Sequence, residues 1–177
     1  GYGQEIELFG RRKGSGEPGW ALKRRVVFVS GDLQLRYPLR RTVLEAILSG
    51  FHDSIGLFEE PSGYEVEQAH GWIERIGLAG RAETRLRTLS FGQRRMVLIA
   101  RVVVKSPLVL IADEPTQGLD DEHASQVLGL LDVIGAESGG CMLYVTHNPD
   151  EELGCLTHTL ELVPDHERGS RPVINAT

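Results

Sequence analysis

The sequence predicts an α/β fold with a mostly parallel sheet flanked by helices. Short apolar runs at residues 25–29, 108–112 and 141–145 have the length of buried strands, and stretches with helical spacing of apolar residues lie between them. The 177 residues are 41% hydrophobic and 25% charged, which is typical of one globular domain, and no apolar run is long enough to span a bilayer.

The amino-terminal third contains two expected strands and one helix. Polar and apolar side chains alternate over residues 5–9, as in a half-exposed strand, and a glycine-rich basic loop follows. The β-branched run at 25–29 predicts a buried strand. Thr42 and Glu45 have the spacing of a capping box, so a helix is expected to begin there and to end near Gly50.

A second helix is expected over residues 65–76, with Gly77 as its carboxyl-terminal cap. Its apolar residues share one helical face: Val66, Ala69, Ile73 and Ile76. Because these two helices interrupt the alternation of strands and helices, residues from about 40 to 90 predict a separate helical subdomain within the domain.

The remaining elements alternate regularly. A helix is expected over residues 91–105, an apolar strand over 108–112 and a helix over 121–134. Strands are then expected over 141–145 and 159–163. Strands that alternate with helices in this way are typical of a parallel sheet.

The start of the third helix combines a cap with groups suited to an anion. Ser90 and Gln93 have capping-box spacing, and taken alone this pattern favours an ordinary helix cap. A helix amino terminus, however, presents free N–H groups and a partial positive charge. Gly92 lets the backbone approach an anion closely, and Ser90 and Gln93 add side-chain donors. The functional interpretation is a surface that faces phosphate.

Two adjacent carboxylates, Asp113 and Glu114, follow the strand at 108–112. The alternative interpretation is a simple turn, with Pro115 ending the strand pairing. Ligands of α/β sheets bind at the carboxyl ends of the strands. There Asp113 can hold Mg²⁺, and Glu114 can orient or deprotonate a water that attacks a γ-phosphate.

Two further residues follow the same logic. Asp120, after Gly118, has the features of a helix amino-terminal cap. His147 follows the strand at 141–145, and a single histidine in such a place is more often structural than catalytic. If the two strands are neighbours, His147 lies within reach of the same ligand and can donate to a γ-phosphate oxygen.

The order and spacing of these segments together resemble the carboxyl-terminal two-thirds of an ABC ATPase domain, a fold of the P-loop NTPase kind. Residues 89–93 resemble the signature motif, with Phe91 in place of the commoner glycine, and residues 108–114 resemble Walker B. Residues 118–120 resemble the D-loop, and His147 resembles the switch histidine.

The resemblance implies ATP hydrolysis with Mg²⁺ in a head-to-tail pair with a second ABC domain, in tandem or as a homodimer. The implied roles are Asp113 for the metal, Glu114 for the attacking water, His147 for the γ-phosphate, Ser90, Gly92 and Gln93 for the γ-phosphate of the opposite domain's ATP, and Asp120 for the link between the two sites.

Three further segments, residues 6–12, 47–56 and 157–164, resemble the second ABC domain of tandem ATP-binding proteins of molybdate transport. This narrower resemblance implies a cytoplasmic protein, peripheral at the inner face of the plasma membrane when a membrane permease is its partner. Direct insertion into the membrane is not expected. The substrate of transport would be selected by that permease.

The sequence departs from the family at two places. A P-loop has the pattern Gly-x-x-x-x-Gly-Lys-Ser/Thr, whereas Lys13 precedes Gly14 and no helix pattern follows. We therefore expect the P-loop to lie upstream of Gly1, in a longer protein of which this fragment alone is inactive. At the Q-loop, the family's glutamine falls near Gly31, and Gln34 lies three residues later.

Two other functions stay open at this point. The chain can be a non-hydrolysing half that only donates its signature motif to a partner's ATP. It can also be a soluble ABC protein that acts on translation or DNA, although a net charge of −6 disfavours nucleic acid as a partner. A local basic cluster is more simply a solvated loop and strand edge, and it consists of Arg11, Arg12, Lys13, Lys23, Arg24 and Arg25.

Overall fold

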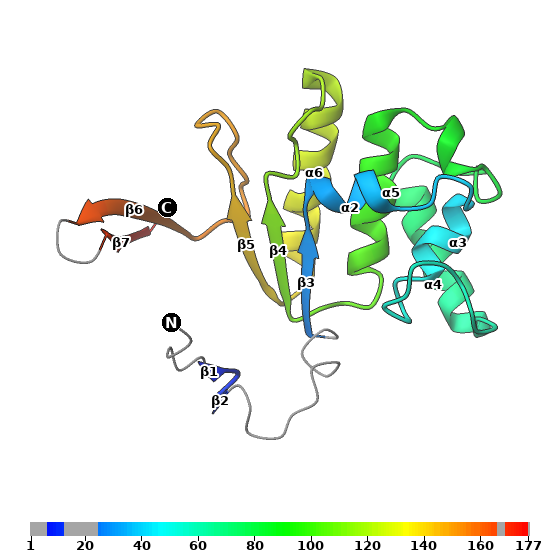
Figure 1. The fold of residues 1–177 in the computed structure, drawn as a ribbon, viewed down its shortest axis with the longest axis horizontal. Coiled ribbons are helices and arrows are strands. Elements are labelled where there is room, and N and C mark those ends of the chain that lie inside the picture. Colours follow the sequence, from blue (N-terminus) through cyan, green and yellow to red (C-terminus); the bar gives the residue numbers. More distant parts are fainter. Residues whose placement is uncertain (1–6, 13–24, 166–168, 177) are drawn as a thin grey trace.

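The structure, a computed structural model, describes residues 7–12, 25–165 and 169–176. At its centre is a parallel sheet of three strands in the order β3–β4–β5 (Figure 1). These strands are β3 (Val26–Val29), β4 (Val109–Asp113) and β5 (Cys141–Val145). The predicted parallel sheet is therefore confirmed, with β4 between its two neighbours.

Two long helices follow the sheet strands, α5 (Phe91–Val103) and α6 (Asp121–Glu137). Both match helices expected from the sequence, although α5 ends two residues earlier than expected and α6 ends three residues later. Their buried residues join one hydrophobic core with alternate residues of the strands, which are Val27, Val29, Leu110 and Ala112.

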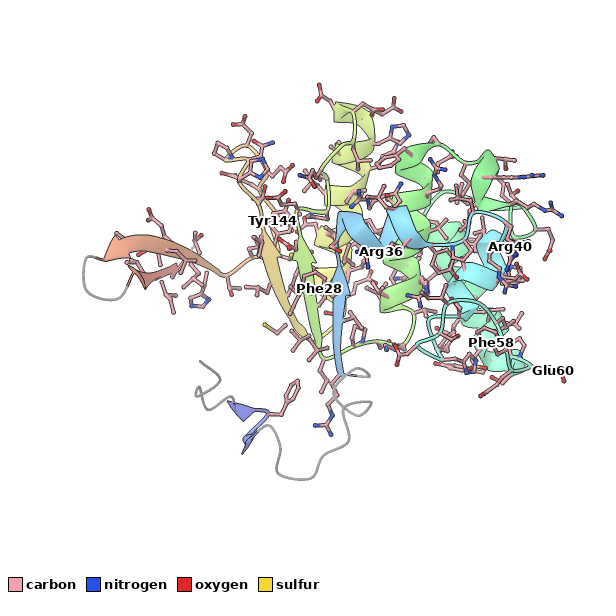
Figure 2. All side chains as sticks on the ribbon, in the orientation of Figure 1. Phe28, Arg36, Arg40, Phe58, Glu60 and Tyr144 are labelled. Atoms are coloured by element: carbon pink, nitrogen blue, oxygen red, sulfur yellow. The ribbon has the colours of Figure 1, made fainter. Side chains whose placement is uncertain are left out.

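The other face of the sheet is more open. Phe28 is 50% exposed, and Leu143 and Val145 are 45% and 42% exposed (Figure 2 shows Phe28). Within the described part of the chain, the strand expected at residues 25–29 is therefore buried on one face and more exposed on the other. Apolar composition at every position does not reveal which face the helices cover.

The helical stretch between β3 and α5 begins with α2 (Gly31–Arg36), which the sequence did not predict. It continues with α3 (Val43–Leu48), α4 (Gly63–Arg75) and the 3₁₀ helix η1 (Leu86–Thr88). The capping box of Thr42 and Glu45 is present, so the start of α3 is confirmed. Helix α4 begins earlier than expected because Ser62 caps it, with Glu65 completing a second capping box.

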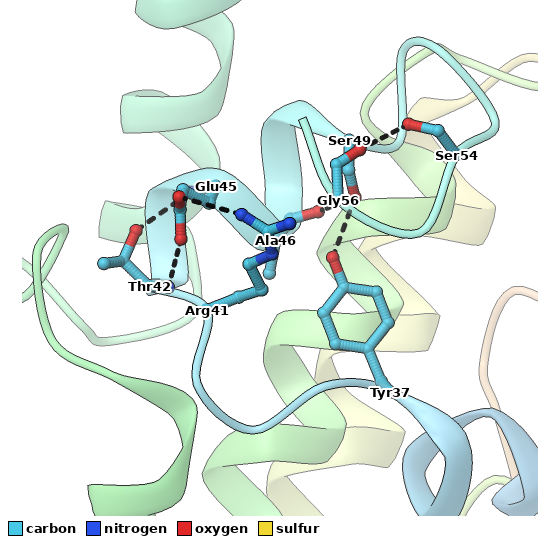
Figure 3. A network of polar contacts seen from close by, with 8 residues as sticks. All are labelled: Tyr37, Arg41, Thr42, Glu45, Ala46, Ser49, Ser54 and Gly56. Carbon is cyan, nitrogen blue, oxygen red and sulfur yellow. Dashed lines mark hydrogen bonds and ion pairs between the residues drawn. The ribbon is translucent and has the colours of Figure 1, made fainter. Parts of the chain in front are cut away.

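A buried polar network surrounds Ser49 in this helical stretch, and Figure 3 draws its contact with Tyr37. Ser49, fully buried at the end of α3, lies 2.9 Å from the hydroxyl of Tyr37 and accepts a hydrogen bond from Nε of Arg101 at 3.0 Å. The chain passes so close to α5 that a Cβ atom at Gly50 would lie 1.9 Å from the carbonyl oxygen of Arg101. The helices share one core with the sheet, and the division into a helical subdomain stays a prediction.

Two antiparallel hairpins complete the described chain. The first pairs β1 (Glu7–Leu8) with β2 (Arg11–Arg12), so β2 falls within the expected loop, whose later residues lie outside the described ones. The second pairs β6 (His158–Asp165) with β7 (Gly169–Ala176). It lies beyond β5, away from the helices (Figure 1). The expected strand at 159–163 is confirmed, whereas β7 was not predicted.

No helix within the described ranges combines the length and the apolarity needed to cross a bilayer.

Candidate functional site

The carboxyl ends of β4 and β5 meet at one edge of the sheet. Asp113 pairs with Val145 in the parallel register, and the backbone N–H of Glu114 donates to the carbonyl of Val145 at 2.9 Å. The loops that follow the two strands therefore begin side by side. This is the edge at which open α/β sheets bind their ligands.

Glu114 and His147 contact each other across this edge. The carboxylate oxygen Oε1 of Glu114 lies 2.8 Å from Nδ1 of His147. The Glu114 side chain is 34% exposed and that of His147 is 77% exposed, so the pair is open to solvent and to a ligand. Glu114 also has a φ of +45°, a left-handed conformation that costs a non-glycine residue about 1–3 kcal/mol. Such strain is often retained where a side chain must be aimed.

Asp113 is the residue best placed to hold a metal. Its half-buried carboxylate has no hydrogen-bond or ion-pair partner among the described residues, so its oxygens are free to act as ligands. The described ranges contain no group of three or more metal-ligating side chains. Mg²⁺ commonly binds through one or two carboxylates together with substrate phosphates, so a single carboxylate at this edge fits Mg²⁺ bound with a nucleotide.

The amino terminus of α5 has the predicted capping box. The backbone N–H of Gln93 donates to Oγ of Ser90 at 3.1 Å, and the backbone N–H of Ser90 donates to Oε1 of Gln93 at 3.1 Å. Both contacts use oxygen atoms as acceptors. The two capping contacts use neither the hydroxyl proton of Ser90 nor the amide protons of Gln93, so the structural and functional interpretations of this motif are compatible.

Asp120 caps α6 and lies next to the start of α5. Its carboxylate accepts a hydrogen bond from the backbone N–H of His123 at 2.9 Å and contacts Nδ1 of the same residue at 2.8 Å. The backbone hydrogen bond and, next, the contact with the ring lower the pKa of Asp120 below its ordinary value. The Nε2 atom of His123 lies 3.1 Å from Oγ of Ser90. The predicted D-loop and signature residues are thus joined by a histidine that the sequence analysis had not singled out.

The predicted site residues therefore form two groups. Asp113, Glu114 and His147 meet at the sheet edge, and the others lie at the amino termini of α5 and α6, namely Ser90, Gly92, Gln93 and Asp120. The first group offers carboxylates and an imidazole, which can hold a metal and move a proton. The second group offers hydrogen-bond donors and two helix amino termini, which suit an anion.

Comparison with known proteins identifies the family of the chain. The family profile described as ABC transporter matches residues 4–117, which is more than half of the chain. The chain belongs to the ABC transporter family.

Relatives and solved structures place the chain more closely within this family. It is 40% identical over 166 residues to the ABC transporter ATP-binding protein ModF of Escherichia coli (strain K12), a match that covers 93% of this chain and 34% of ModF. Among solved structures, a metal-chelate type ABC transporter in an inward-facing conformation is 25% identical, with a TM-score of 0.68, over 86% of this chain and 58% of the other.

A dimeric ATP-binding cassette bound to ADP and phosphate is 22% identical, with a TM-score of 0.67, over 88% of this chain and 67% of the other. At this identity the likeness shows the fold alone. The chain spans about a third of the length of ModF.

In this ABC domain, sequence reasoning missed Glu151, which ties the loops at the sheet edge together. Its carboxylate accepts hydrogen bonds from the hydroxyls of Thr116 at 2.6 Å, Tyr144 at 2.5 Å and Thr146 at 2.7 Å. Burial raises the pKa of Glu151, but these three donors outweigh it and the net shift is downward. Thr116 lies in the loop after β4, far in the sequence from Tyr144 and Thr146, so no single local pattern could have revealed the cluster.

The structure gives Gln34 a role that differs from that of a Q-loop glutamine. Gln34 is buried in α2, where its amide nitrogen donates to the carbonyl of Phe91 at 2.8 Å and its oxygen accepts from Nε of Arg95 at 2.7 Å. Both of its polar groups are therefore used by the helix that carries the signature motif. Gln34 lies three residues after the position expected for the family's Q-loop glutamine, and these contacts hold it against α5.

A cleft of about 620 Å³ lies between α4, α5 and α6. Of the predicted site residues only Gln93 lines it, and the sheet edge with Glu114 is not part of it. Because the chemistry-bearing side chains lie elsewhere, we place the candidate site at the sheet edge and the two helix termini.

Proposed function

We propose that this chain supplies the metal-binding, water-activating and signature segments of an ATP-hydrolysing ABC domain that works head to tail with a second ABC domain. The observation that carries the proposal is the contact between Glu114 and His147 beside the unpaired carboxylate of Asp113. The family resemblance implies that these residues contact the γ-phosphate and its attacking water.

At the sheet edge, each side chain has a distinct task. Asp113 holds Mg²⁺, which neutralises charge on the phosphates when it is bound. Glu114 orients the attacking water and accepts its proton, since one carboxylate oxygen is 2.8 Å from His147 and the other is available to the water. His147 donates a hydrogen bond to a γ-phosphate oxygen. The positive φ of Glu114 keeps its carboxylate at this edge.

At the two helix termini, the same chain serves the ATP of the opposite domain. Ser90 and Gln93 donate hydrogen bonds to that γ-phosphate, because their capping contacts use only their oxygen atoms as acceptors. Gly92 is buried and admits the His123 ring beside Ser90, because a Cβ atom there would lie 2.1 Å from Cδ2 of that ring. Asp120 lies beside this group and connects it, through the loop after β4, to the catalytic carboxylates of its own domain.

Replacing Glu114 by glutamine in the complete protein tests the catalytic assignment. An amide cannot accept the proton of the attacking water, so we expect ATP turnover to fall by about 100-fold or more and ATP to remain bound. A phosphate-release assay measures turnover, and filter binding measures trapped ATP. The exposed Glu83→Gln is the matched control, and unchanged turnover in Glu114→Gln would rule out Glu114 as the base.

A second candidate function is favoured by one observation. The 177 residues contain no Gly-x-x-x-x-Gly-Lys-Ser/Thr pattern, which is the usual phosphate cradle of such enzymes. The domain can therefore act as a non-hydrolysing half that donates its signature motif to a partner's ATP. In that case Ser90→Ala in the complete protein lowers turnover whereas Glu114→Gln does not.

The biological setting that we propose is transport, with molybdate as the substrate and a separate membrane permease as the partner. The support is the identity to ModF together with the resemblance to tandem ATP-binding proteins, of which this chain would be part of the second domain. We place the complete protein in the cytoplasm, at the inner face of the plasma membrane when it is bound to the permease. Molybdenum accumulation in cells that lack the protein is the measurement, and normal accumulation would reject this substrate.

A further inference from the structure

His123 lies directly against the signature motif. A Cβ atom at Gly92 would be 2.1 Å from Cδ2 and 2.3 Å from Cγ of the His123 ring, so the ring occupies the space that the missing side chain leaves. Its two nitrogens have different partners, because Nδ1 is 2.8 Å from the carboxylate of Asp120 and Nε2 is 3.1 Å from Oγ of Ser90. The ring is thus fixed between a D-loop carboxylate and the signature hydroxyl.

The hydrogen-bond capacity of Ser90 shows what this contact does. A serine hydroxyl has one proton to donate and two lone pairs that accept. One lone pair already accepts the backbone N–H of Gln93 at 3.1 Å. The remaining lone pair and the proton must therefore serve both His123 and any anion that approaches the helix.

The protonation of His123 decides whether a lone pair or the hydroxyl proton of Ser90 faces the anion. In the neutral ring with its proton on Nδ1, Nε2 is an acceptor and takes the hydroxyl proton of Ser90, so a lone pair of the serine faces the anion. In the doubly protonated ring, Nε2 donates to the serine oxygen. Both lone pairs are then in use, and the hydroxyl proton is free to bind the anion.

We propose that His123 is a positioning residue of the signature motif, whose protonated ring turns the Ser90 hydroxyl toward the γ-phosphate bound by the opposite domain. This inference rests on the proposed function, in which Ser90 contacts that phosphate. His123 itself does not touch the nucleotide. It links the signature motif to Asp120, so that the affinity of the motif for phosphate depends on pH.

The charged groups around His123 indicate that the pH dependence arises at one atom of the ring, Nε2. Among the described residues, Asp120 is the titratable group in contact with the ring, and it accepts the Nδ1 proton in both forms. Asp121 and Glu122 on the same turn of α6 are exposed. On α5 the ring lies against Gly92 and Ser90, which are uncharged, and Arg94 and Arg95 of the same turn each lie 5.8 Å from the centroid of the Phe91 ring. A change in protonation therefore alters the Nε2 side of the ring, which contacts Ser90.

The test compares the pH dependence of ATP turnover in the complete protein with that of the His123→Gln variant. A glutamine amide nitrogen is a donor at every pH, so it replaces the protonated ring permanently. We expect kcat/KM of the unaltered protein, divided by that of His123→Gln, to fall about tenfold between pH 6 and pH 8.5, which is the effect of one hydrogen bond to an ionised group. The ratio removes any pH effect that both proteins share. If His123→Gln lowers the amount of folded protein equally at each pH, the pH dependence of the ratio does not change.

A ratio that stays constant across this pH range would overturn the role of His123. The Ser90→Ala variant separates that outcome from failure of the proposed function. If Ser90→Ala lowers kcat/KM by about tenfold or more while the ratio stays constant, only the inference about His123 fails. If Ser90→Ala leaves kcat/KM unchanged, the proposed role of the signature motif fails, and the inference fails with it.

Discussion

Arg95 is a buried cation whose described contacts include no carboxylate. It is 2% exposed, and its guanidinium donates to the side-chain oxygen of Gln34 at 2.7 Å and to the carbonyl of Gln117 at 3.3 Å. The Nη1 atom has no partner within the described part of the chain. Burial lowers the pKa of Arg95 below its ordinary value. A guanidinium held only by neutral acceptors depends strongly on each of them.

This dependence predicts the effect of replacing Gln34. In Gln34→Leu the Nε atom of Arg95 loses its acceptor, so we expect the free energy of unfolding to fall by about 1–3 kcal/mol. Urea denaturation of the chain measures this change, and the exposed Gln126→Leu is the matched control. Adding Arg95→Met should restore part of the loss, since an apolar pair needs no hydrogen bonds. A double variant less stable than Gln34→Leu would contradict this account.

At the scale of elements, Glu151 joins the loops that follow β4 and β5. Thr116 belongs to the loop after β4, Tyr144 to β5 and Thr146 to the loop that carries His147. Burial and, next, the contact with Glu151 raise the pKa of Tyr144, which therefore stays protonated as a donor over the ordinary pH range. The hydrogen bonds of Glu151 stabilise the backbone segments that carry Glu114 and His147.

Replacing Glu151 by glutamine should loosen both loops. An amide cannot accept from all three hydroxyls as strongly as a carboxylate, so we expect the free energy of unfolding at pH 7 to fall by about 1–3 kcal/mol. The pKa of Glu151 is lowered in the folded chain, so its contribution is present above the unfolded value of about 4.3 and is lost as pH falls through the folded value. The difference between the two proteins should therefore shrink at acid pH.

Urea denaturation at pH 7 and pH 3 measures both effects of this substitution. The exposed neighbour Glu152→Gln is the control and should change stability by less than about 0.5 kcal/mol. Equal stability of Glu151→Gln and Glu152→Gln at pH 7 would show that the three hydroxyl contacts contribute nothing to folding.

At the scale of the whole molecule, the function that we propose divides the site residues between two nucleotides. In that proposal Asp113, Glu114 and His147 supply metal-binding and catalytic groups for one nucleotide, and the start of α5 supplies donors for the other. The sequence contains no P-loop pattern to grip the phosphates of either one. Most of the affinity for ATP should therefore come from residues outside this chain.

We accordingly expect the 177-residue chain alone to bind Mg-ATP only weakly and to hydrolyse it negligibly. Isothermal titration calorimetry should give no binding in the micromolar range, whereas the complete protein serves as the positive control. Micromolar binding by the isolated chain would mean that these residues form a phosphate cradle of a different kind.

The sequence by itself determined the fold class, most element positions and the family. The β-branched and apolar runs fixed β4 and β5 to within a residue, because a strand needs continuous apolar side chains where it is buried. The capping boxes at Thr42 and Ser90 placed the starts of α3 and α5, because such caps are local and depend on neighbours three residues apart. The short helix α2 and strand β7 were missed, since neither has a comparable local signal.

Only the tertiary structure decided how the site residues meet. The contact of Glu114 with His147 depends on the parallel register of β4 and β5, which joins residues far apart in the sequence. The place of His123 against Ser90 depends on the packing of α6 beside α5, and that of Gln34 on the packing of α2. Local patterns report short-range propensity and capping, whereas these contacts arise from long-range packing, which a single sequence does not display.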